Sequence, residues 1–502
     1  MTTVLEARQI TKTYGDFIAN DGIDFSLHKG EIHAIVGENG AGKTTLMRML
    51  YGMEAPTSGD IVCQGEVKRF QSPLEAIQSG IGMVFQHFML FPTYTVAENI
   101  VIGNEPARGI WFDRKLAADR IKALCETYQL HVDPDQKVSE CSLGTRQRIE
   151  ILKVLYNGAD IIILDEPTAV LTPLEVKELL VTIKRLAKQG KSIILITHKL
   201  HEVMEAADRV TVLRNGKVTG TLEADRTSAE EISRLMVGRE LEGVARQDNK
   251  AGEPVLQVRK LVVKGANGKA LLNDINFDVC AGEIVGIAGV SGNGQSELVR
   301  VLNGLIKADQ GSMLLDGTDV TNLPVRRIRA AGLAHIPEDR YLWGASKDAS
   351  VKENAIMGHY RKDGCHRFGL LRHKRLNQLV HGWVQSFAVK TASIHEQAQY
   401  LSGGNLQKLI SAREIGQHTK CIIAAEPTRG VDLGAMEIIH RQLLRKRESG
   451  EAVLVVSSEL SEMMTLSDRI LVMFEGEIVG ELKGKDASEE EISLLMAGGG
   501  RA

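Results

Sequence analysis

The sequence predicts an α/β chain built from two tandem copies of one unit. Residues 228–238 recur almost unchanged at 488–498, an offset of 260 residues (488 minus 228). Within each copy, short apolar segments rich in β-branched residues alternate with stretches of helix-forming residues. A glycine-rich loop follows one apolar segment in each copy, at residues 37–44 and 289–296. This alternation favours a mostly parallel sheet that binds ligands at the carboxyl ends of its strands.

Length and composition fit two globular domains. The chain has 502 residues, too many for one core, and we expect domains at 2–241 and 254–499 joined by a polar linker at 242–253. Apolar residues make up 43% and charged residues 25%, and the net charge of −3 supplies no general field that attracts nucleic acid or anionic lipid. The amino terminus does not follow the plan of a signal peptide, and no apolar run is long enough to span a bilayer. The six cysteines form no C-x-x-C pair, as expected of reduced thiols.

Six apolar segments are expected to form the buried parallel strands of the two copies. They are Ile32–Val36, Ile161–Leu164 and Ile193–Ile196 in the first copy, and Ile284–Ala288, Cys421–Ala425 and Val453–Val456 in the second. Between the glycine-rich loop and the second of these strands, residues 95–155 and 345–410 are rich in helix formers. We expect each to form a helical subdomain.

The first glycine-rich loop matches the phosphate-binding pattern G-x-x-x-x-G-K-[ST] in full. Its glycines let backbone N–H groups converge on an anion at the start of a helix. Lys43 is expected to reach the β- and γ-phosphates of a nucleotide, and the Thr44 hydroxyl to bind Mg²⁺. The candidate nucleotide-binding residues of this loop are Gly37, Asn39, Gly40, Gly42, Lys43, Thr44 and Thr45.

The second loop has the same glycines but lacks the lysine. Gln295 stands in its place and can donate a hydrogen bond, although it carries no charge. The candidate residues of this degenerate loop are Gly289, Gly292, Gly294, Gln295 and Ser296.

Polar residues with possible catalytic roles end the strands of the first copy. Asp165 is placed to hold Mg²⁺ and Glu166 to polarise the attacking water, although an Asp-Glu pair after an apolar strand is often only structural. His198 follows the next strand and could contact the γ-phosphate, while a lone histidine is more often structural. Gln86 is a candidate to sense both Mg²⁺ and the water. Tyr14 could stack on adenine, or it could be an ordinary core tyrosine.

Residues 401–405, Leu-Ser-Gly-Gly-Asn, carry a resemblance that extends over nearly the whole chain. The segment is similar to the signature motif of ATP-binding cassette (ABC) proteins, and residues 141–145, Cys-Ser-Leu-Gly-Thr, are an irregular second copy that keeps Ser142 and Gly144. The resemblance implies two cassettes, each with a RecA-like core, an antiparallel β subdomain and a helical subdomain. It also implies that Ser402, Gly403, Gly404 and Asn405 contact ATP bound by the opposite cassette.

Head-to-tail pairing, as the resemblance implies, sorts these residues into two unequal ATP sites. The first site would join Lys43, Thr44, Gln86, Asp165, Glu166 and His198 with residues 402–405. The second would join Gln295 and Ser296 with residues 141–145. It keeps Glu426, but Ala425 replaces the aspartate, Ser458 replaces the histidine, and Glu338 lies near the glutamine position in an uncertain register. We therefore expect the first site to hydrolyse ATP with Mg²⁺ and the second at most to hold nucleotide.

The chain resembles in particular the ATP-binding subunit of bacterial importers for simple sugars and nucleosides. Residues 294–298, 426–434 and 457–460 match the second cassette of that group, and residues 86–99 resemble its nucleoside branch. The resemblance implies partner permeases, an extracytoplasmic solute-binding protein and a peripheral place at the cytoplasmic face of the membrane, without insertion into it and without nucleic acid. A simple sugar or riboflavin is the alternative cargo.

The resemblance also implies that each cassette has a groove that grips the permease. Residues 86–95 and 337–343 would line these grooves. Residues 88–91 could instead belong to the core of the helical subdomain.

Two other classes of function compete with import. Soluble twin-cassette ATPases that act on ribosomes or nucleic acid usually carry a long charged linker, whereas this stretch is about a dozen residues. A nucleotide-gated binding module without turnover would not need Asp165, Glu166 and His198.

Overall fold

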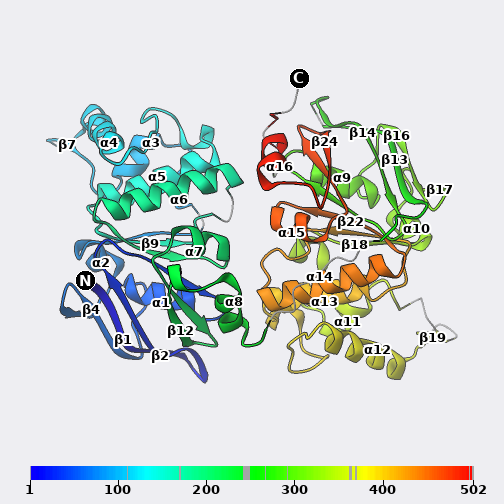
Figure 1. Ribbon diagram of the computed structural model, residues 1–502, viewed down its shortest axis with the longest axis horizontal. Helices are drawn as coiled ribbons and strands as arrows, with labels where there is room; N and C mark the ends of the chain where they lie inside the picture. Colours follow the sequence, from blue (N-terminus) through cyan, green and yellow to red (C-terminus); the bar gives the residue numbers. More distant parts are fainter. Residues whose placement is uncertain are drawn as a thin grey trace. The chain divides into compact units, whose positions relative to one another are not determined.

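A computed structural model describes most of the chain and divides it into two compact units, residues 1–241 and 242–502 (Figure 1). The described residues are 2–86, 88–109, 111–168, 171–240, 249–265, 267–290, 292–360, 365–367, 370–496 and 498–499. Most of the predicted linker therefore lies outside the described residues. Its last part packs on the second unit, where Asn249 Nδ2 donates to the Gly282 carbonyl at 3.0 Å.

A six-stranded sheet forms the centre of the first unit. Its strands are β3 Ile32–Gly37, β6 Ile81–Val84, β9 Ile161–Asp165, β10 Ser192–Ile196, β11 Arg209–Arg214 and β12 Lys217–Glu223. Their order is β12-β11-β3-β10-β9-β6, and all run parallel except β12, which is antiparallel to β11. The three strands predicted from the sequence are confirmed. Parallel order brings the ends of β3, β9 and β10 to one edge, where the polar residues follow them.

Alternation along each strand supplies apolar side chains to both faces of this sheet. Ile161 and Ile163 join the cluster beneath the antiparallel sheet and the first helix, whereas Ile162 and Leu164 join the cluster of the helical subdomain. A strand covered on both faces must be apolar throughout, which explains the continuous Ile-Ile-Ile-Leu run.

Helices and a second sheet cover the two faces of the first core (Figure 1). The antiparallel sheet has the order β2-β1-β4-β5, made of β1 Thr3–Tyr14, β2 Phe17–His28, β4 Ser58–Cys63 and β5 Glu66–Lys68. The helices are α1 Lys43–Leu50, α2 Pro73–Gln78, α3 Val96–Val101, α4 Arg114–Tyr128, α5 Leu143–Tyr156, α6 Pro173–Lys188, α7 Leu200–Ala206 and α8 Ala229–Val237. Helices α3, α4 and α5, with the hairpin β7 Ala107–Arg108 and β8 Trp111–Phe112, form the predicted helical subdomain.

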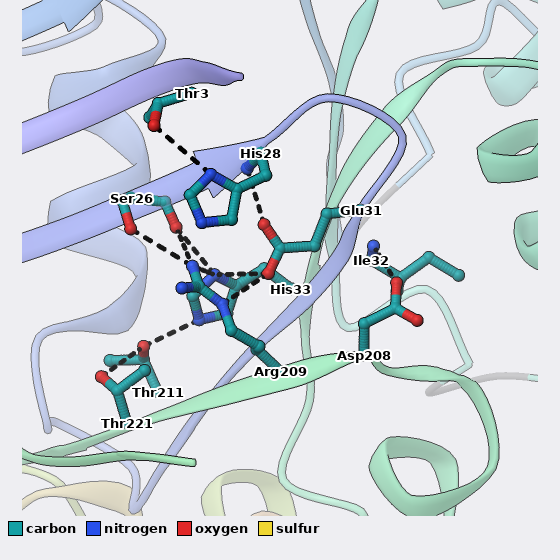
Figure 2. A network of polar contacts seen from close by, with 10 residues as sticks. All are labelled: Thr3, Ser26, His28, Glu31, Ile32, His33, Asp208, Arg209, Thr211 and Thr221. Carbon is teal, nitrogen blue, oxygen red and sulfur yellow. Dashed lines mark hydrogen bonds and ion pairs between the residues drawn. The ribbon is translucent and has the colours of Figure 1, made fainter. Parts of the chain in front are cut away.

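A buried polar network ties the antiparallel sheet of the first unit to its core sheet (Figure 2). Arg209 on β11 donates to Glu31 at 2.6 Å and to the Ser26 carbonyl of β2, also at 2.6 Å. His33 on β3 contacts the Ser26 carbonyl through Nδ1 at 2.9 Å and the Thr211 hydroxyl through Nε2 at 2.8 Å. Burial, and then the charge of Arg209, lower the pKa of His33 to about 3, so the ring is neutral at pH 7.

The second unit repeats this architecture. Its core order is β18-β21-β22-β15-β23-β24 and its antiparallel order β14-β13-β16-β17. The core strands are β15 Ile284–Ala288, β18 Leu333–Ile336, β21 Cys421–Ala425, β22 Ala452–Ser457, β23 Arg469–Phe474 and β24 Glu477–Lys483. The other strands are β13 Pro254–Lys264, β14 Ala270–Cys280, β16 Gln310–Leu315 and β17 Thr318–Asp319, with a hairpin of β19 His366–Arg367 and β20 Leu370–Leu371. The helices are α9 Gln295–Leu302, α10 Val325–Ala331, α11 Val351–Ile356, α12 His373–Ser386, α13 Gly403–Ile415, α14 Leu433–Glu448, α15 Leu460–Leu466 and α16 Glu489–Met496.

Within the ranges that the structure describes, no helix combines the length and the apolar character needed to cross a membrane.

Candidate nucleotide site

The intact loop of the first unit joins β3 to α1 in a conformation that requires its glycines. Gly42 has φ 99°, and a Cβ there would lie 2.5 Å from the Ala19 carbonyl oxygen. A Cβ at Gly37 would lie 2.3 Å from the Leu213 carbonyl oxygen. Any larger residue at these positions would force the backbone apart, so the predicted loop geometry follows from sterics.

Lys43 folds back over this loop. Its ammonium donates to the Gly37 carbonyl at 2.7 Å and to the Glu38 carbonyl at 3.1 Å. Burial lowers the pKa of Lys43, and the charges of Glu166 and Asp165 oppose that shift. The same lysine can exchange its carbonyl partners for phosphate oxygens, which are stronger acceptors.

Glu166 is the centre of the polar cluster at this edge. One carboxylate oxygen accepts from Gln86 Nε2 at 3.0 Å, and the other contacts His198 Nδ1 at 3.1 Å. The residue has φ 46°, a conformation that non-glycine residues seldom adopt outside special sites. Burial raises the pKa of Glu166, but the hydrogen bond and charge of His198, followed by Lys43, outweigh it and hold the pKa below its usual range. An ionised carboxylate is therefore held between Gln86, the predicted sensor of Mg²⁺ and water, and His198, the predicted γ-phosphate contact.

Asp165 lies beside Glu166 at the end of β9 and is buried. Burial, and then the charge of Glu166, raise the pKa of Asp165 to about 6. A buried carboxylate near Lys43 and the start of α1 supplies the hard oxygen ligand that Mg²⁺ prefers, and the Thr44 hydroxyl and the Gln86 amide oxygen are of the same ligand class. The donor set thus fits the predicted metal.

Tyr14 is 47% exposed, so it is not the core tyrosine that the sequence left as an alternative. Its hydroxyl donates to Glu54, and Lys12 Nζ lies 5.3 Å from its ring centre. Thr45 of α1 also interacts with its hydroxyl. The ring is therefore an exposed aromatic surface next to the phosphate loop.

The second unit places its residues at the same positions with different partners. Its β18 and β21 pair Ile336 with Ala424, just as β6 and β9 pair Val84 with Leu164. Gln86 and Glu338 each lie two residues beyond these paired positions, which settles the register that the sequence left uncertain. Ser296 Oγ donates to Glu338 at 2.6 Å.

Glu426 differs most from its counterpart. It shares the left-handed backbone, with φ 45°, but its carboxylate accepts from the Ser458 backbone N–H at 2.8 Å. Burial raises the pKa of Glu426 to about 7, against the lowering effect of Ser458. Ser458 follows β22 where His198 follows β10, and its hydrogen bonds offset only part of the effect of burial.

Gln295 is turned toward its own loop, as Lys43 is. The Gln295 amide lies where a Cβ at Gly289 would stand, and that Cβ would also lie 2.9 Å from the Met473 carbonyl oxygen, so this loop also needs its first glycine. Gly292 and Gly294 have φ 96° and 103°, close to the values of Gly40 and Gly42. The degenerate loop keeps the backbone geometry and loses only the charge.

The signature residues stand at the starts of α5 and α13. Ser402 caps α13 and accepts from the Asn405 backbone N–H at 3.4 Å; Ser142 caps α5 and accepts from Thr145 N–H at 3.2 Å. A serine cap and glycine N–H groups at a helix start suit an anion.

The irregular signature at residues 141–145 makes a contact that was not predicted from the sequence. The Gly144 N–H donates to Glu175 Oε1 of α6 at 3.1 Å, whereas Ala435 occupies that position of α14. The capping-box pattern Thr172-Pro-Leu-Glu175 was the available sequence signal for the carboxylate, but nothing in it indicated Gly144.

Two apolar segments near the site are exposed. Met89 is 55% and Phe91 is 51% exposed, while Leu90 packs on the core of the helical subdomain. Met89 and Phe91 therefore fit the prediction of a partner surface, whereas Leu90 fits the alternative prediction of a subdomain core. In the second unit, Tyr341, Leu342 and Trp343 are also exposed.

Comparison with known proteins agrees with this geometry. The ABC transporter family model matches residues 20–169 and 272–429, one stretch in each unit. The chain belongs to the ABC transporter family. Its two units are therefore cassettes.

The nucleoside import ATP-binding protein NupA of Lactococcus lactis subsp. cremoris is 45% identical to the chain. The alignment covers 99% of this chain and 98% of that protein. The ribose import ATP-binding protein RbsA 1 of Rubrobacter xylanophilus is 38% identical, over 100% of this chain and 99% of that protein.

The crystal structure of an archaeal ribosome recycling factor, in complex with a ribosomal stalk protein, matches 98% of this chain and 92% of its own with a TM-score of 0.66. The identity is 18%, so this likeness shows the shared twin-cassette fold alone.

Proposed function

We propose that this chain is the ATP-hydrolysing subunit of an importer for nucleosides, with one competent and one degenerate ATP site. The observation that carries the proposal is Glu166, held as an ionised carboxylate between Gln86 and His198 at the edge that also holds Lys43. A carboxylate in this position can orient and polarise a water molecule for attack on a γ-phosphate.

In this proposal the first cassette binds the triphosphate. Lys43 and the loop glycines receive the phosphates, Tyr14 offers its ring to adenine, and Thr44, Asp165 and Gln86 hold Mg²⁺, which supplies charge neutralisation to the phosphates. Ser402, Gly403, Gly404 and Asn405 complete the site through head-to-tail pairing of cassettes. The degenerate site takes Gln295, Ser296 and Glu426 with Ser142 and Gly144.

Energetics favour this division of labour. Each charged hydrogen bond that is lost removes roughly 1.5–3 kcal/mol. The second cassette lacks the lysine, the aspartate and the histidine, and about 1.4 kcal/mol corresponds to a tenfold change in rate. Hydrolysis in the degenerate site should therefore be slower by several powers of ten.

The relatives support the proposed cargo and partners. The higher identity to a nucleoside import protein than to a ribose import protein supports the nucleoside branch. The chain would act at the cytoplasmic face of the membrane with two permease subunits and a solute-binding protein, and the exposed segments at 88–91 and 341–343 would meet the permeases. Simple sugars are the second candidate cargo.

Reconstitution tests the proposal directly. The chain, the proposed permeases and the solute-binding protein would be placed in proteoliposomes, and ATP-dependent uptake of labelled guanosine and of labelled ribose would be compared. Uptake of guanosine that requires ATP inside the vesicles is the expected result. Uptake of ribose alone would replace the cargo, and ATP hydrolysis that no permease stimulates would contradict the transport role.

A further inference from the structure

The second cassette carries a patch of positive charge in a chain whose net charge is negative. From residue 364 to residue 395 the sequence contains no aspartate or glutamate, whereas the whole chain has a net charge of −3. Arg372, Lys374 and Arg375 are exposed in this stretch, and within the part of the chain that the structure describes none of them forms an ion pair. Neighbouring cations without acidic partners create a local positive potential that attracts anions from outside the chain.

The corresponding stretch of the first cassette has a different charge pattern. The hairpins before α4 and α12 correspond at an offset of 259 residues (370 minus 111). Asp113 caps α4 by accepting from the Leu116 N–H at 3.0 Å. Arg372 and Arg375 occupy these two positions in the second cassette, and the Arg372 side chain provides no cap. The second cassette therefore gives up a stabilising cap for two positive charges, which indicates a role other than stability.

Two leucines are exposed directly before the basic residues. Leu370 is 75% and Leu371 is 40% exposed on β20, and the equivalent hairpin of the first cassette exposes Trp111 by 75%. Apolar side chains beside cations suit the boundary between lipid head groups and acyl chains. Nucleic acid fits less well, because a leucine offers no ring on which a base can stack.

Helix α12 holds these residues on the surface of the second unit. Leu376 and Val380, one turn apart, are fully buried in the core of that unit. Lys374 precedes Leu376 by two residues and so lies on the opposite face of the helix. The packed face fixes the helix, and the basic residues project from its exposed part.

Helix α11 connects this patch to the exposed segment 341–343. Lys352 Nζ on α11 lies 3.3 Å from His373 Nδ1 of α12 and adds a further cation. Asn354, also on α11, accepts from the Ser346 N–H at 2.8 Å. The patch therefore lies one helix away from the segment that the proposed function assigns to a permease.

We propose that β20 and the first turn of α12 bind the surface of a membrane that contains anionic phospholipid. Leu370 and Leu371 rest at the level of the head groups, and Arg372, Lys374 and Arg375 contact the lipid phosphates. The proposed function needs only permeases to hold the chain at the membrane, so this contact goes beyond it. The inference rests on that function in one respect, because the permease places the patch near lipid.

Vesicle sedimentation is the direct test. The purified full-length chain would be mixed with vesicles of phosphatidylcholine and with vesicles of phosphatidylcholine and phosphatidylglycerol in equal amounts. Partitioning to the anionic vesicles should be stronger by about tenfold or more and should weaken as salt is added. Arg372→Asp combined with Arg375→Leu copies the first cassette. It should weaken this binding about a hundredfold, because each positive charge near an anionic surface contributes about fivefold.

A matched variant of the first cassette controls for total charge. Lys115→Gln, Arg120→Gln and Lys122→Gln together remove the same three charges from α4, among acidic residues, and should weaken binding less than about fivefold. ATP turnover equal to that of the parent chain shows that both variants are folded. Equal binding of the parent to the two kinds of vesicle, or equal losses in the two charge variants, would overturn the inference.

The leucines separate a lipid surface from a general polyanion surface. Leu370→Ser combined with Leu371→Ser should weaken binding to the anionic vesicles about fivefold or more and leave binding to a DNA duplex unchanged. If this variant binds the vesicles as tightly as the parent, the patch recognises charge alone and the lipid assignment fails.

The proposed function has a separate readout. Sedimentation uses the chain without permease, solute-binding protein or ATP, so a failure to bind vesicles leaves the uptake experiment unaffected. A failure of uptake in the reconstituted system, in turn, does not change the vesicle result.

Discussion

The two cassettes carry the same glutamate after the same buried strand, yet its surroundings give it opposite properties. Glu166 contacts Gln86 and His198 and has a lowered pKa, whereas Glu426 accepts a backbone N–H and its pKa is raised to about 7. Their backbones match, with φ 46° and 45°. The comparison teaches that the reactivity of this glutamate depends on the residues ending the neighbouring strands, because burial alone would neutralise it.

The largest expected effect comes from removing the charge of the first glutamate. Glu166→Gln should lower ATP turnover by about 10²–10⁴-fold, since a positioned base contributes that much to proton transfer. Steady-state phosphate release by the purified chain measures it. The matched Glu426→Gln should leave turnover within twofold, because that carboxyl lacks the histidine partner. Comparable losses in both variants would mean that the two sites share the work.

Exchanging the loop residues tests the second difference. Lys43→Gln copies Gln295 and should lower kcat/KM for ATP roughly tenfold to a hundredfold, because one charged hydrogen bond of about 1.5–3 kcal/mol is lost. The reciprocal Gln295→Lys should raise nucleotide affinity without raising turnover, since Ala425 and Ser458 remain. A gain in hydrolysis from Gln295→Lys alone would show that the lysine is the only defect of the second loop.

Much of this comparison could be predicted from the sequence because it depends on residue identity at fixed offsets. The strands at 161–164 and 421–425 are apolar on both faces and bounded by turns, and the loop pattern fixes the first helix start. Ala425 and Ser458 could be aligned with Asp165 and His198 by counting.

What could not be predicted depends on side-chain direction. The offset between the units is 252 residues at the loops and 260 after the helical subdomain, so Glu338 had no certain register until β18 paired with β21. Its contact with Ser296 depends on rotamers, as does the reach of Glu175 to Gly144. A sequence encodes such contacts only through packing around them.

The buried His33 of the first cassette should make that cassette lose stability in mild acid. His33 has a folded-state pKa of about 3 and an unfolded value near 6.5, so below pH 6.5 the unfolded chain binds a proton that the folded chain does not. The contribution of His33 to stability is therefore full above pH 6.5 and falls by about 2 kcal/mol from pH 6.5 to pH 5. The charged and titratable groups that face His33 are Arg209, Glu31 and His28.

His33→Val copies Val285 of the second cassette and should remove most of that slope. Denaturation followed by peroxide oxidation reports each unit separately, through the buried Met47 in the first and the buried Met473 in the second. The midpoint for Met473 serves as the internal control. Burial also lowers the pKa of His335 in that unit, to about 4, and His335 is unchanged, so the acid slope at Met473 should persist. An unaltered pH slope at Met47 would exclude His33 as its source.

The smallest expected effect concerns the two signature helices. The Gly144 N–H at the start of α5 already donates to Glu175. In the second cassette Ala435 replaces that glutamate, and Asp432, whose carboxylate lies near Gly404, accepts from the Ala435 N–H instead. An anion at a helix start is worth about 0.3–1 kcal/mol, so Glu175→Ala should free the irregular signature and tighten the weaker of two ATP-binding events about twofold to fivefold. Calorimetric titration of ATP into the Glu166→Gln chain measures both events.

Thr172→Ala is the matched control. It removes the partner hydroxyl of the same capping box but keeps the carboxylate of Glu175, so it should weaken α6 without changing the affinity for ATP. If both substitutions change ATP binding equally, the effect comes from the cap of α6, and Glu175 does not compete with the nucleotide.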